Sequence, residues 1–164
     1  MLDEVDGPAL DIGCGPGRLA AALTRRGIAV LGVDTAPAAA SIAAGRGVQV
    51  LVRSVFDRLP GAGAWSTVLL IDGNLGIGGD PVALLARVAR LLRSSGRVLV
   101  EVDPPGTRTR RLMVRPEIDG VPKPGWFPWA EVGADALPGL AARAGFGLEE
   151  LWTDGGRWFA RLGA

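Results

Sequence analysis

The residues with the clearest chemical potential lie in a glycine-rich turn near the start of the chain. Residues 11–17 read DIGCGPG; they follow the apolar run 8–10 and precede residues 18–23, which have helical composition. Glycines in such a turn let backbone N–H groups approach a ligand without a Cβ in the way. Asp34 ends the next apolar run, where a carboxylate can accept hydrogen bonds from both ribose hydroxyls. Together these features predict a βαβ unit that binds a nucleoside.

The residues around the glycines narrow the kind of nucleoside. The dinucleotide fingerprint G-x-G-x-x-G, read from Gly13, requires glycine at position 18, where the chain has Arg18. No Lys-Ser or Lys-Thr follows the glycines, which excludes a nucleotide-triphosphate loop. Asp11 also disfavours an anionic ligand, because a carboxylate there suits a cationic group better than a phosphate. The turn therefore favours a cationic nucleoside.

Composition excludes several classes of partner. A chain of 164 residues fits one domain, 1–164, that can bury a core. Its net charge of +1 gives no electrostatic reason to expect nucleic acid, and no apolar run approaches the ~20 residues of a membrane span. The acidic N-terminus lacks the features of a signal peptide, and a single cysteine cannot form an internal disulfide. We therefore expect a cytoplasmic protein with neither a nucleic-acid nor a membrane partner.

The absence of histidine and tyrosine limits the chemistry further. Without histidine the chain lacks the commonest general base, the Ser-His-Asp arrangement and the usual zinc ligands. No metal site is expected. Any reaction must depend on carboxylates, on a cofactor or on positioning alone.

The rest of the chain alternates strand and helix patterns. Strands are expected at residues 8–12, 28–33, 48–52, 67–71 and 97–102, and helices at 17–26, 37–44, from Asp80 to just before Gly96, and 135–144. Thr35, Asp80 and Asp135 are the expected N-caps. The strand patterns are nearly continuous in apolar character, as in a parallel sheet covered on both faces. A hairpin of residues 148–152 and 157–162 should add an antiparallel strand at one end.

The glycine pattern and the final hairpin resemble a known family. Asp11-x-Gly13-x-Gly15-x-Gly17 is similar to motif I of class I methyltransferases that use S-adenosylmethionine (SAM), and the hairpin resembles their last two strands. The resemblance covers the chain from about residue 8. It implies an α/β fold, a Rossmann-like three-layer sandwich whose seven-stranded sheet is mostly parallel, with SAM at the carboxyl ends of the first strands.

The resemblance also implies residue roles. Asp11 would reach the amino group of the methionine part, the three glycines would cradle SAM, and Asp34 would bind the ribose. Asp57 would meet the adenine amino group, and Asp72 would lie beside the transferring methyl. The complete expected cofactor set is Asp11, Gly13, Cys14, Gly15, Gly17, Asp34, Thr35, Val55, Phe56, Asp57, Asp72 and Asn74.

Some of these residues have a structural alternative. Asp57 and Arg58 can form a solvated loop pair, and Asp72 can be a turn residue before Gly73. A small buried thiol such as Cys14 is more often packing than chemistry.

A base is needed only if the methyl acceptor must lose a proton. The catalytic candidates are Asp72, Glu101 and Asp103, the last two at the end of the strand 97–102, where they can equally be surface-turn residues. The Asp-Pro-Pro at 103–105 follows the fifth strand. In amino-methylating enzymes with an Asp-Pro-Pro-Tyr motif it follows the fourth, so their amine specificity does not carry over.

Residues 103–130 interrupt the alternation and are expected to form an irregular excursion with a strand near 110–115. Its aromatic residues, Trp126, Phe127 and Trp129, either wall an apolar acceptor or seal the excursion onto the sheet. Its basic stretch either attracts an acidic or phosphorylated acceptor or forms a solvated edge. That stretch comprises Arg108, Arg110, Arg111 and Arg115.

These observations predict a SAM-dependent methyltransferase that acts on a small-molecule metabolite at oxygen, nitrogen or carbon. The alternative is a SAM-fold binding protein or partner subunit without methyl transfer of its own. Relatives usually carry N-terminal helices over SAM, whereas the first strand here begins within about ten residues. A minimal enzyme, a lid from a second copy or partner subunit, and a shortened sequence are the three explanations.

Overall fold

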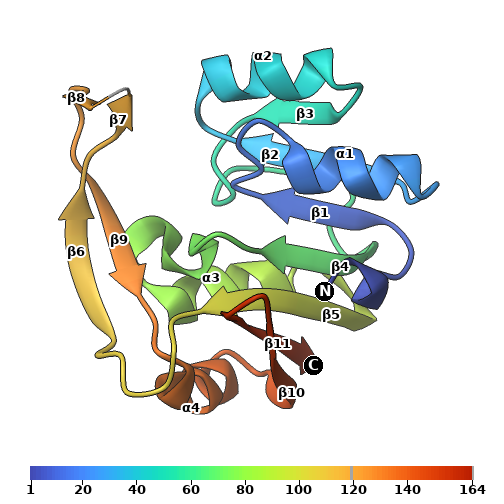
Figure 1. Ribbon diagram of the computed structural model, residues 1–164. Helices are drawn as coiled ribbons and strands as arrows, with labels where there is room; N and C mark the ends of the chain where they lie inside the picture. The colour runs from blue at the N-terminus through green and yellow to red at the C-terminus, as the bar shows by residue number, and fades with distance from the viewer. Residues whose placement is uncertain (119, 164) are drawn as a thin grey trace.

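The computed structural model describes residues 1–118 and 120–163 and contains a seven-stranded sheet (Figure 1). The strand order is β10-β11-β5-β4-β1-β2-β3; β1 to β5 are parallel, and β11 is antiparallel to both β5 and β10. The strands are β1 (Ala9–Ile12), β2 (Val30–Asp34), β3 (Gln49–Val52), β4 (Trp65–Leu70), β5 (Leu92–Val102), β10 (Gly147–Asp154) and β11 (Arg157–Gly163). The predicted α/β fold class is confirmed.

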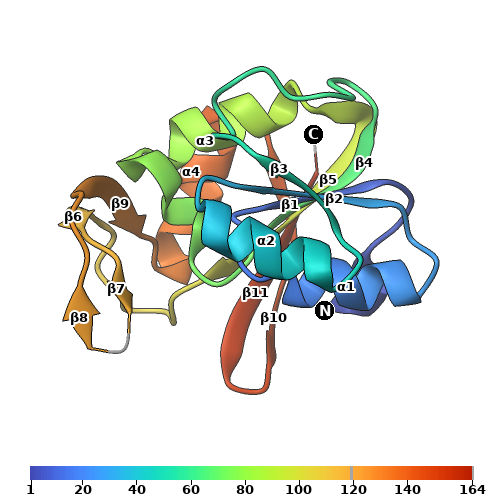
Figure 2. The ribbon, with the colours of Figure 1, turned by 90° about the horizontal axis from the view of Figure 1, so that it is seen from above.

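Helices cover both faces of the sheet (Figure 2). Helices α1 (Arg18–Arg25) and α2 (Pro37–Gly45) lie on one face, and α3 (Pro81–Ala89) and α4 (Leu137–Arg143) lie on the other. Successive strand side chains point to opposite faces, so β4 sends Val68 into the core beneath α3 and α4 and Leu69 into the core beneath α1. Short 3₁₀ helices occur at η1 (Leu2–Glu4), η2 (Asn74–Gly79) and η3 (Ala134–Ala136).

The third predicted helix was too long. Its helical spacing continues to Leu92, but α3 ends at Ala89 and Leu92 already pairs with Trp65 in the sheet. Gly96, expected just beyond the helix, lies inside β5, where a Cβ would come within 2.9 Å of the Trp65 carbonyl oxygen. The end of the helix is therefore determined by the pairing of β5 with β4 and not by the helical spacing of the apolar residues.

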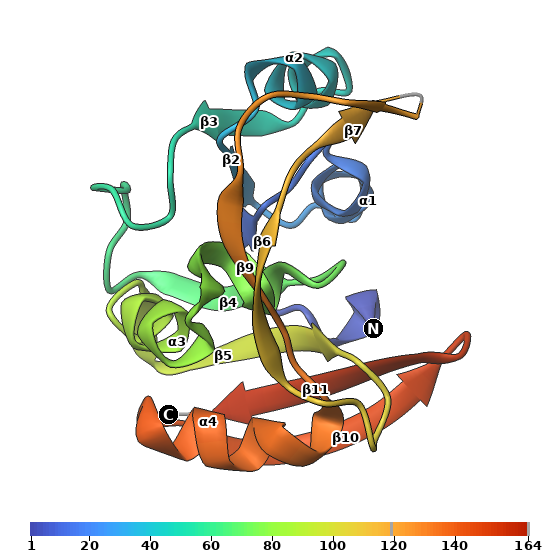
Figure 3. The same cartoon turned by 90° about the vertical axis from the view of Figure 1, so that its left-hand side faces the viewer.

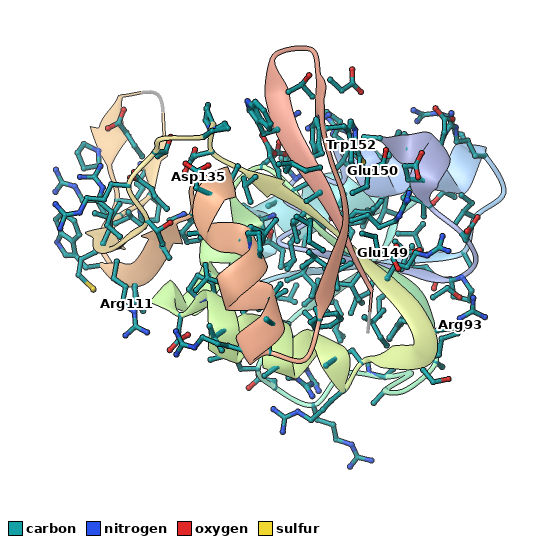
Figure 4. All side chains as sticks on the ribbon, turned by 90° about the horizontal axis from the view of Figure 1, so that it is seen from below. Arg93, Arg111, Asp135, Glu149, Glu150 and Trp152 are labelled. Carbon is teal, nitrogen blue, oxygen red and sulfur yellow. The ribbon has the colours of Figure 1, made fainter. Side chains whose placement is uncertain are left out.

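The predicted caps had mixed outcomes. Asp80 caps α3 by accepting the Ala83 N–H at 3.1 Å, as predicted. Thr35 does not cap α2, because the cap is Ala36, whose N–H is bound by Asp34. Asp135 does not cap α4 either: its carboxylate, labelled in Figure 4, accepts the Gly106 N–H at 2.6 Å.

Residues 110–118 and 120–131 form a two-stranded arm beside the carboxyl ends of the parallel strands (Figures 1 and 3). Strands β6 (Arg110–Val114) and β9 (Phe127–Glu131) pair antiparallel, and the short strands β7 (Glu117–Ile118) and β8 (Val121–Pro122) pair near the tip. The strand expected near 110–115 is confirmed, whereas the expectation of an otherwise irregular excursion was wrong. No helix among the described residues is long and apolar enough to cross a membrane.

The basic stretch on this arm has mainly structural partners. Arg110 pairs with Glu131 across the two arm strands, and Arg111 pairs with Asp80 at the start of α3, each at 2.7 Å. The guanidinium of Arg115 lies 5.2 Å from the centre of the Trp126 ring. These contacts fasten the arm to itself and to the body of the protein.

Candidate functional site

The site begins at the turn between β1 and α1. Gly13 and Gly17 have φ angles of +70° and +75°, which side-chain-bearing residues rarely adopt. A Cβ on Gly13 would lie 2.6 Å from the Asn74 amide nitrogen, and one on Gly17 would lie 2.8 Å from the Ala43 Cβ. Both glycines are therefore required by backbone angle and by space. Gly17 acts through packing of α1 and α2, since it lines neither of the cavities described below.

Asn74 joins this turn to the end of β4. Its side-chain amide donates hydrogen bonds to the carbonyl oxygens of Ile12 and Gly13, both at 2.9 Å. Asn74 is the first residue of η2, so the amide connects the segment after β4 to the turn after β1. The sequence placed Asn74 in the site, and its structural contacts explain how the two strand ends are held together.

Asp34 is fixed at the end of β2. Its carboxylate accepts the Gly15 N–H and the Ala36 N–H, each at 2.8 Å. Each carboxylate oxygen offers two lone pairs, so both retain capacity for a further donor. A side chain held from two directions is already oriented for a ligand with paired hydroxyl groups.

Asp11 is the most unusual polar group of the site. Its side chain is 2% exposed, and its Oδ2 atom has no hydrogen-bond partner among the described residues. Burial, followed by the nearby Asp72 carboxylate, raises the pKa of Asp11 to about 7 against the lowering effects of the Ala20 N–H and Arg18. An orphaned buried carboxyl costs free energy unless a donor or cation satisfies it. This site therefore suits a positively charged group.

Two cavities lie beside the turn and share Gly13 and Asn74 as lining residues. The first, which we call the arm cavity, has a volume of about 510 Å³ and extends from β2 to the arm. It is lined by Ile12, Gly13, Val33, Asp34, Thr35, Ala36, Arg53, Ser54, Val55, Phe56, Asn74, Ile77, Gly78, Pro116, Phe127, Pro128 and Trp129. The second, the turn cavity, has a volume of about 460 Å³ and contains Asp11, Cys14, Gly15, Arg18, Arg46 and Asp72. Most of the predicted cofactor residues are thus brought together.

Besides Gly17, two of the predicted residues have a different setting. Asp57 lines a further, open cavity that shares Arg53 and Phe56 with the arm cavity, and its carboxylate accepts the Ser54 N–H at 3.2 Å. Cys14 reaches the turn cavity, but its thiol packs so closely on Gly32 that a Cβ there would lie 2.7 Å from the sulfur. Burial, then the carboxylates of Asp11 and Asp34, raise the pKa of this thiol to about 12. Cys14 is therefore suited to packing and not to nucleophilic attack.

Two of the three catalytic candidates, Asp72 and Glu101, form ion pairs with arginines. Arg157, the first residue of β11, binds both Glu101 and Asp72, the latter at 2.5 Å, and Arg18 pairs with Asp72 at 3.1 Å. Hydrogen bonding to Glu101 is the main cause that raises the pKa of Arg157. Asp72 also has a φ of +59°, and its N–H donates to Glu101 at 2.6 Å. This strained corner is therefore held in place by an ionic network.

The remaining candidate, Asp103, has a different environment. It lines a small cavity of about 130 Å³ together with Glu101, Trp129 and Glu131. Its main chain is fixed by the Val132 carbonyl at 2.8 Å and by the Ala134 N–H at 2.9 Å. Within residues 1–118 and 120–163, the Asp103 carboxylate has no hydrogen bond or ion pair. Of the three carboxylates it is the one that is not bound to an arginine.

The aromatic residues of the arm divide between two roles. Phe127 and Trp129 line the arm cavity, and Trp129 also lines the small cavity. Trp126 is 61% exposed and contacts Arg115 instead. Sequence reasoning missed Arg157 as a site residue, because its partner Asp72 lies 85 positions away and no local pattern joins them.

Comparison with known families decides what this geometry represents. Residues 9–96, more than half of the chain, match the methyltransferase domain family. The chain belongs to this family. As a class I methyltransferase it uses SAM, so the resemblance, enzyme class and cofactor predicted from the sequence are confirmed. A search of curated proteins found no match.

Solved structures agree on the fold of this methyltransferase. A SAM-dependent methyltransferase from Bacteroides fragilis, in complex with S-adenosyl-L-homocysteine, is 24% identical with a TM-score of 0.78, over 98% of this chain and 73% of that chain. The 1,6-didemethyltoxoflavin-N1-methyltransferase of Burkholderia thailandensis is 22% identical with a TM-score of 0.68, over 95% and 69%. A methyltransferase from Methanosarcina mazei is 15% identical with a TM-score of 0.73, over 96% and 91%.

The residues of this chain fit the methyl donor. SAM carries a ribose with two hydroxyls, and Asp34 presents a fixed carboxylate with free lone pairs. It also carries an ammonium group, and Asp11 presents a buried oxygen without a partner among the residues described. The turn between them depends on glycine, because a Cβ on Gly13 would overlap the Asn74 side chain that joins the turn to the end of β4.

Proposed function

We propose that this methyltransferase binds SAM across the arm and turn cavities and methylates a small-molecule acceptor that enters at the base of the arm. The observation that carries the proposal is that the two cavities share Gly13 and Asn74 as lining residues, with Asp34 in one and the orphaned Asp11 in the other. SAM, when bound, supplies an electrophilic methyl group on a sulfonium. Asp34 would hold the ribose, Val55 and Phe56 would flank the adenine, and Asp11 would pair with the ammonium.

The acceptor side is supported by the small cavity. Its volume of about 130 Å³ admits a small chemical group next to Trp129 and Asp103. Methyl transfer from a sulfonium is a direct displacement, so alignment and exclusion of water are the main tasks of the protein. Where the acceptor atom carries a proton, Asp103 would take it as the new bond to the methyl carbon forms. Asp72 and Glu101 would position the site through Arg157.

Measurement of SAM binding tests the premise that this site holds the methyl donor. Asp34→Ala is expected to weaken binding of SAM and S-adenosylhomocysteine by about 1.5–3 kcal/mol, the scale of hydrogen bonds to a charged group. Isothermal titration calorimetry measures this loss, with Asp57→Ala for comparison because that carboxylate lines a different cavity from Asp34. Unchanged affinity in Asp34→Ala would remove Asp34 from the site. A loss in Asp57→Ala of equal size would move the adenine toward Asp57.

The acceptor role is tested by turnover. Incubation with labelled SAM and a metabolite extract should yield a methylated small molecule, whereas a partner subunit without its own activity would bind SAM and release no product. With that acceptor, Asp103→Asn should lower kcat about 10²-fold or more if a proton must leave, and should leave the Kd for SAM unchanged. An unaltered kcat would mean that Asp103 is not the base.

The cellular setting belongs to the same proposal. A lone buried cysteine that forms no disulfide suits a cytoplasmic protein. A second copy or a partner subunit covering the open donor site would exclude water from it. Sedimentation with and without S-adenosylhomocysteine tests that assembly.

A further inference from the structure

The turn cavity is lined by an arginine, Arg18, that has no part in the contacts with SAM proposed above. Arg18 is the first residue of α1 and lines this cavity together with Asp11, Arg46 and Asp72. Its side chain is 61% exposed, and among the described residues its partner is Asp72, at 3.1 Å. Asp72 is itself 57% exposed, and an ion pair between two such exposed groups contributes little to stability. Arg18 can therefore exchange this partner at little cost.

The two other arginines at or next to this cavity already have partners. Arg157 also binds Asp72, at 2.5 Å, so that carboxylate keeps an ion-pair partner when Arg18 leaves it. Arg46 donates to the Pro16 carbonyl oxygen at 2.8 Å, which ties its guanidinium to the turn backbone. Asp11 differs from them. It is buried, and within the described part of the chain its Oδ2 has no partner, so it can bind a positively charged group. The cavity thus offers one site for a positive group and one exchangeable arginine.

A zwitterion satisfies both sites at once. The amino-acid end of SAM carries an ammonium and a carboxylate on the same carbon, so a ligand whose ammonium meets Asp11 places its carboxylate in the same cavity. Resting on the proposed function, we propose that Arg18 releases Asp72 and binds the α-carboxylate of the methyl donor. Guanidinium and carboxylate form planar bidentate hydrogen bonds, so an arginine suits this role better than a lysine. Arg18 is therefore a positioning residue for the donor.

Decarboxylated SAM separates this proposal from general donor binding. The probe keeps the adenosine, sulfonium and amine but lacks the carboxylate. In calorimetry at pH 8 the wild-type protein should bind it about 10–100-fold more weakly than SAM, the scale of a charged hydrogen-bonded pair. Arg18→Gln should lose that factor for SAM and bind the decarboxylated probe as the wild type does. Arg18→Lys should keep part of the discrimination.

Two matched variants decide between the arginines. Arg157→Gln removes the other partner of Asp72 and should retain the discrimination, because Arg157 does not line the turn cavity. Arg46→Gln should also retain it. Discrimination unchanged in Arg18→Gln, or lost in Arg46→Gln instead, would overturn the proposal while leaving SAM binding intact. A wild-type protein that binds neither SAM nor S-adenosylhomocysteine would overturn the proposed function itself.

Discussion

Replacing Asp11 by Asn is expected to increase folding stability by on the order of 4 kcal/mol at pH 8 and by less than half of that at pH 5. The cause is the buried, unpartnered carboxyl, whose pKa is about 7 in the folded protein against 3.8 when exposed. Between these values the folded state binds more protons than the unfolded state. Stability from this group is therefore present at low pH and lost as the pH rises through 7.

Urea denaturation at both pH values measures the difference. Asp3→Asn is the matched control, because that side chain is 81% exposed and should leave stability nearly unchanged at either pH. An Asp11→Asn variant with wild-type stability at pH 8 would show that Asp11 has a partner there.

Donor binding should respond in the opposite direction to the same substitution. The ionised form of Asp11 pairs with the ammonium of SAM, so the wild-type affinity should rise as the pH increases through about 7. Asp11→Asn should bind SAM about 10–100-fold more weakly at pH 8, with little dependence on pH between about 6 and 8. A protein that becomes more stable yet binds its donor less well is the signature of a strained binding residue. Parallel pH profiles for both proteins would contradict it.

The parts of the fold that the sequence predicted depend on local signals. The glycine turn requires left-handed backbone at Gly13 and Gly17, and no other residue type fits the space there. The Asp80-Pro81 cap and the apolar strands are likewise local, and each formed close to where it was expected. The donor residues of the turn follow from the same signal, because the carboxyl ends of neighbouring parallel strands meet at one edge.

The parts that sequence reasoning missed depend on contacts between distant residues. The end of α3 was misplaced because Leu92 fits the helical period, yet its pairing with Trp65 puts it in β5. The arm was expected to be irregular because its strands are short and proline-rich, and only their pairing makes them regular. The Arg157–Asp72 contact joins the start of β11 to the turn after β4, and no spacing rule links them.

Gly76→Ala is expected to destabilise the protein by about 3 kcal/mol through the junction between η2 and the arm. A Cβ at this position would lie 2.1 Å from the Ala130 carbonyl oxygen and 2.7 Å from the Trp129 indole nitrogen. The first of these is a backbone atom of β9, so the overlap can be relieved only if the arm moves away from η2. Trp129 lines both the arm cavity and the small cavity, so that movement would also disturb the acceptor side.

The same substitution at Gly139 tests whether the effect belongs to the junction. Gly139 lies in α4, and an alanine Cβ there would meet no described atom within 4 Å, so Gly139→Ala should leave stability unchanged or raise it by up to about 1 kcal/mol. Thermal unfolding of the two variants provides the comparison, and turnover of the acceptor should fall at least ~10-fold in Gly76→Ala alone. If Gly76→Ala were as stable and active as Gly139→Ala, β9 would not pack on η2 at this distance. Because β9 also carries Trp129, the arm would then have no fixed place in the acceptor site.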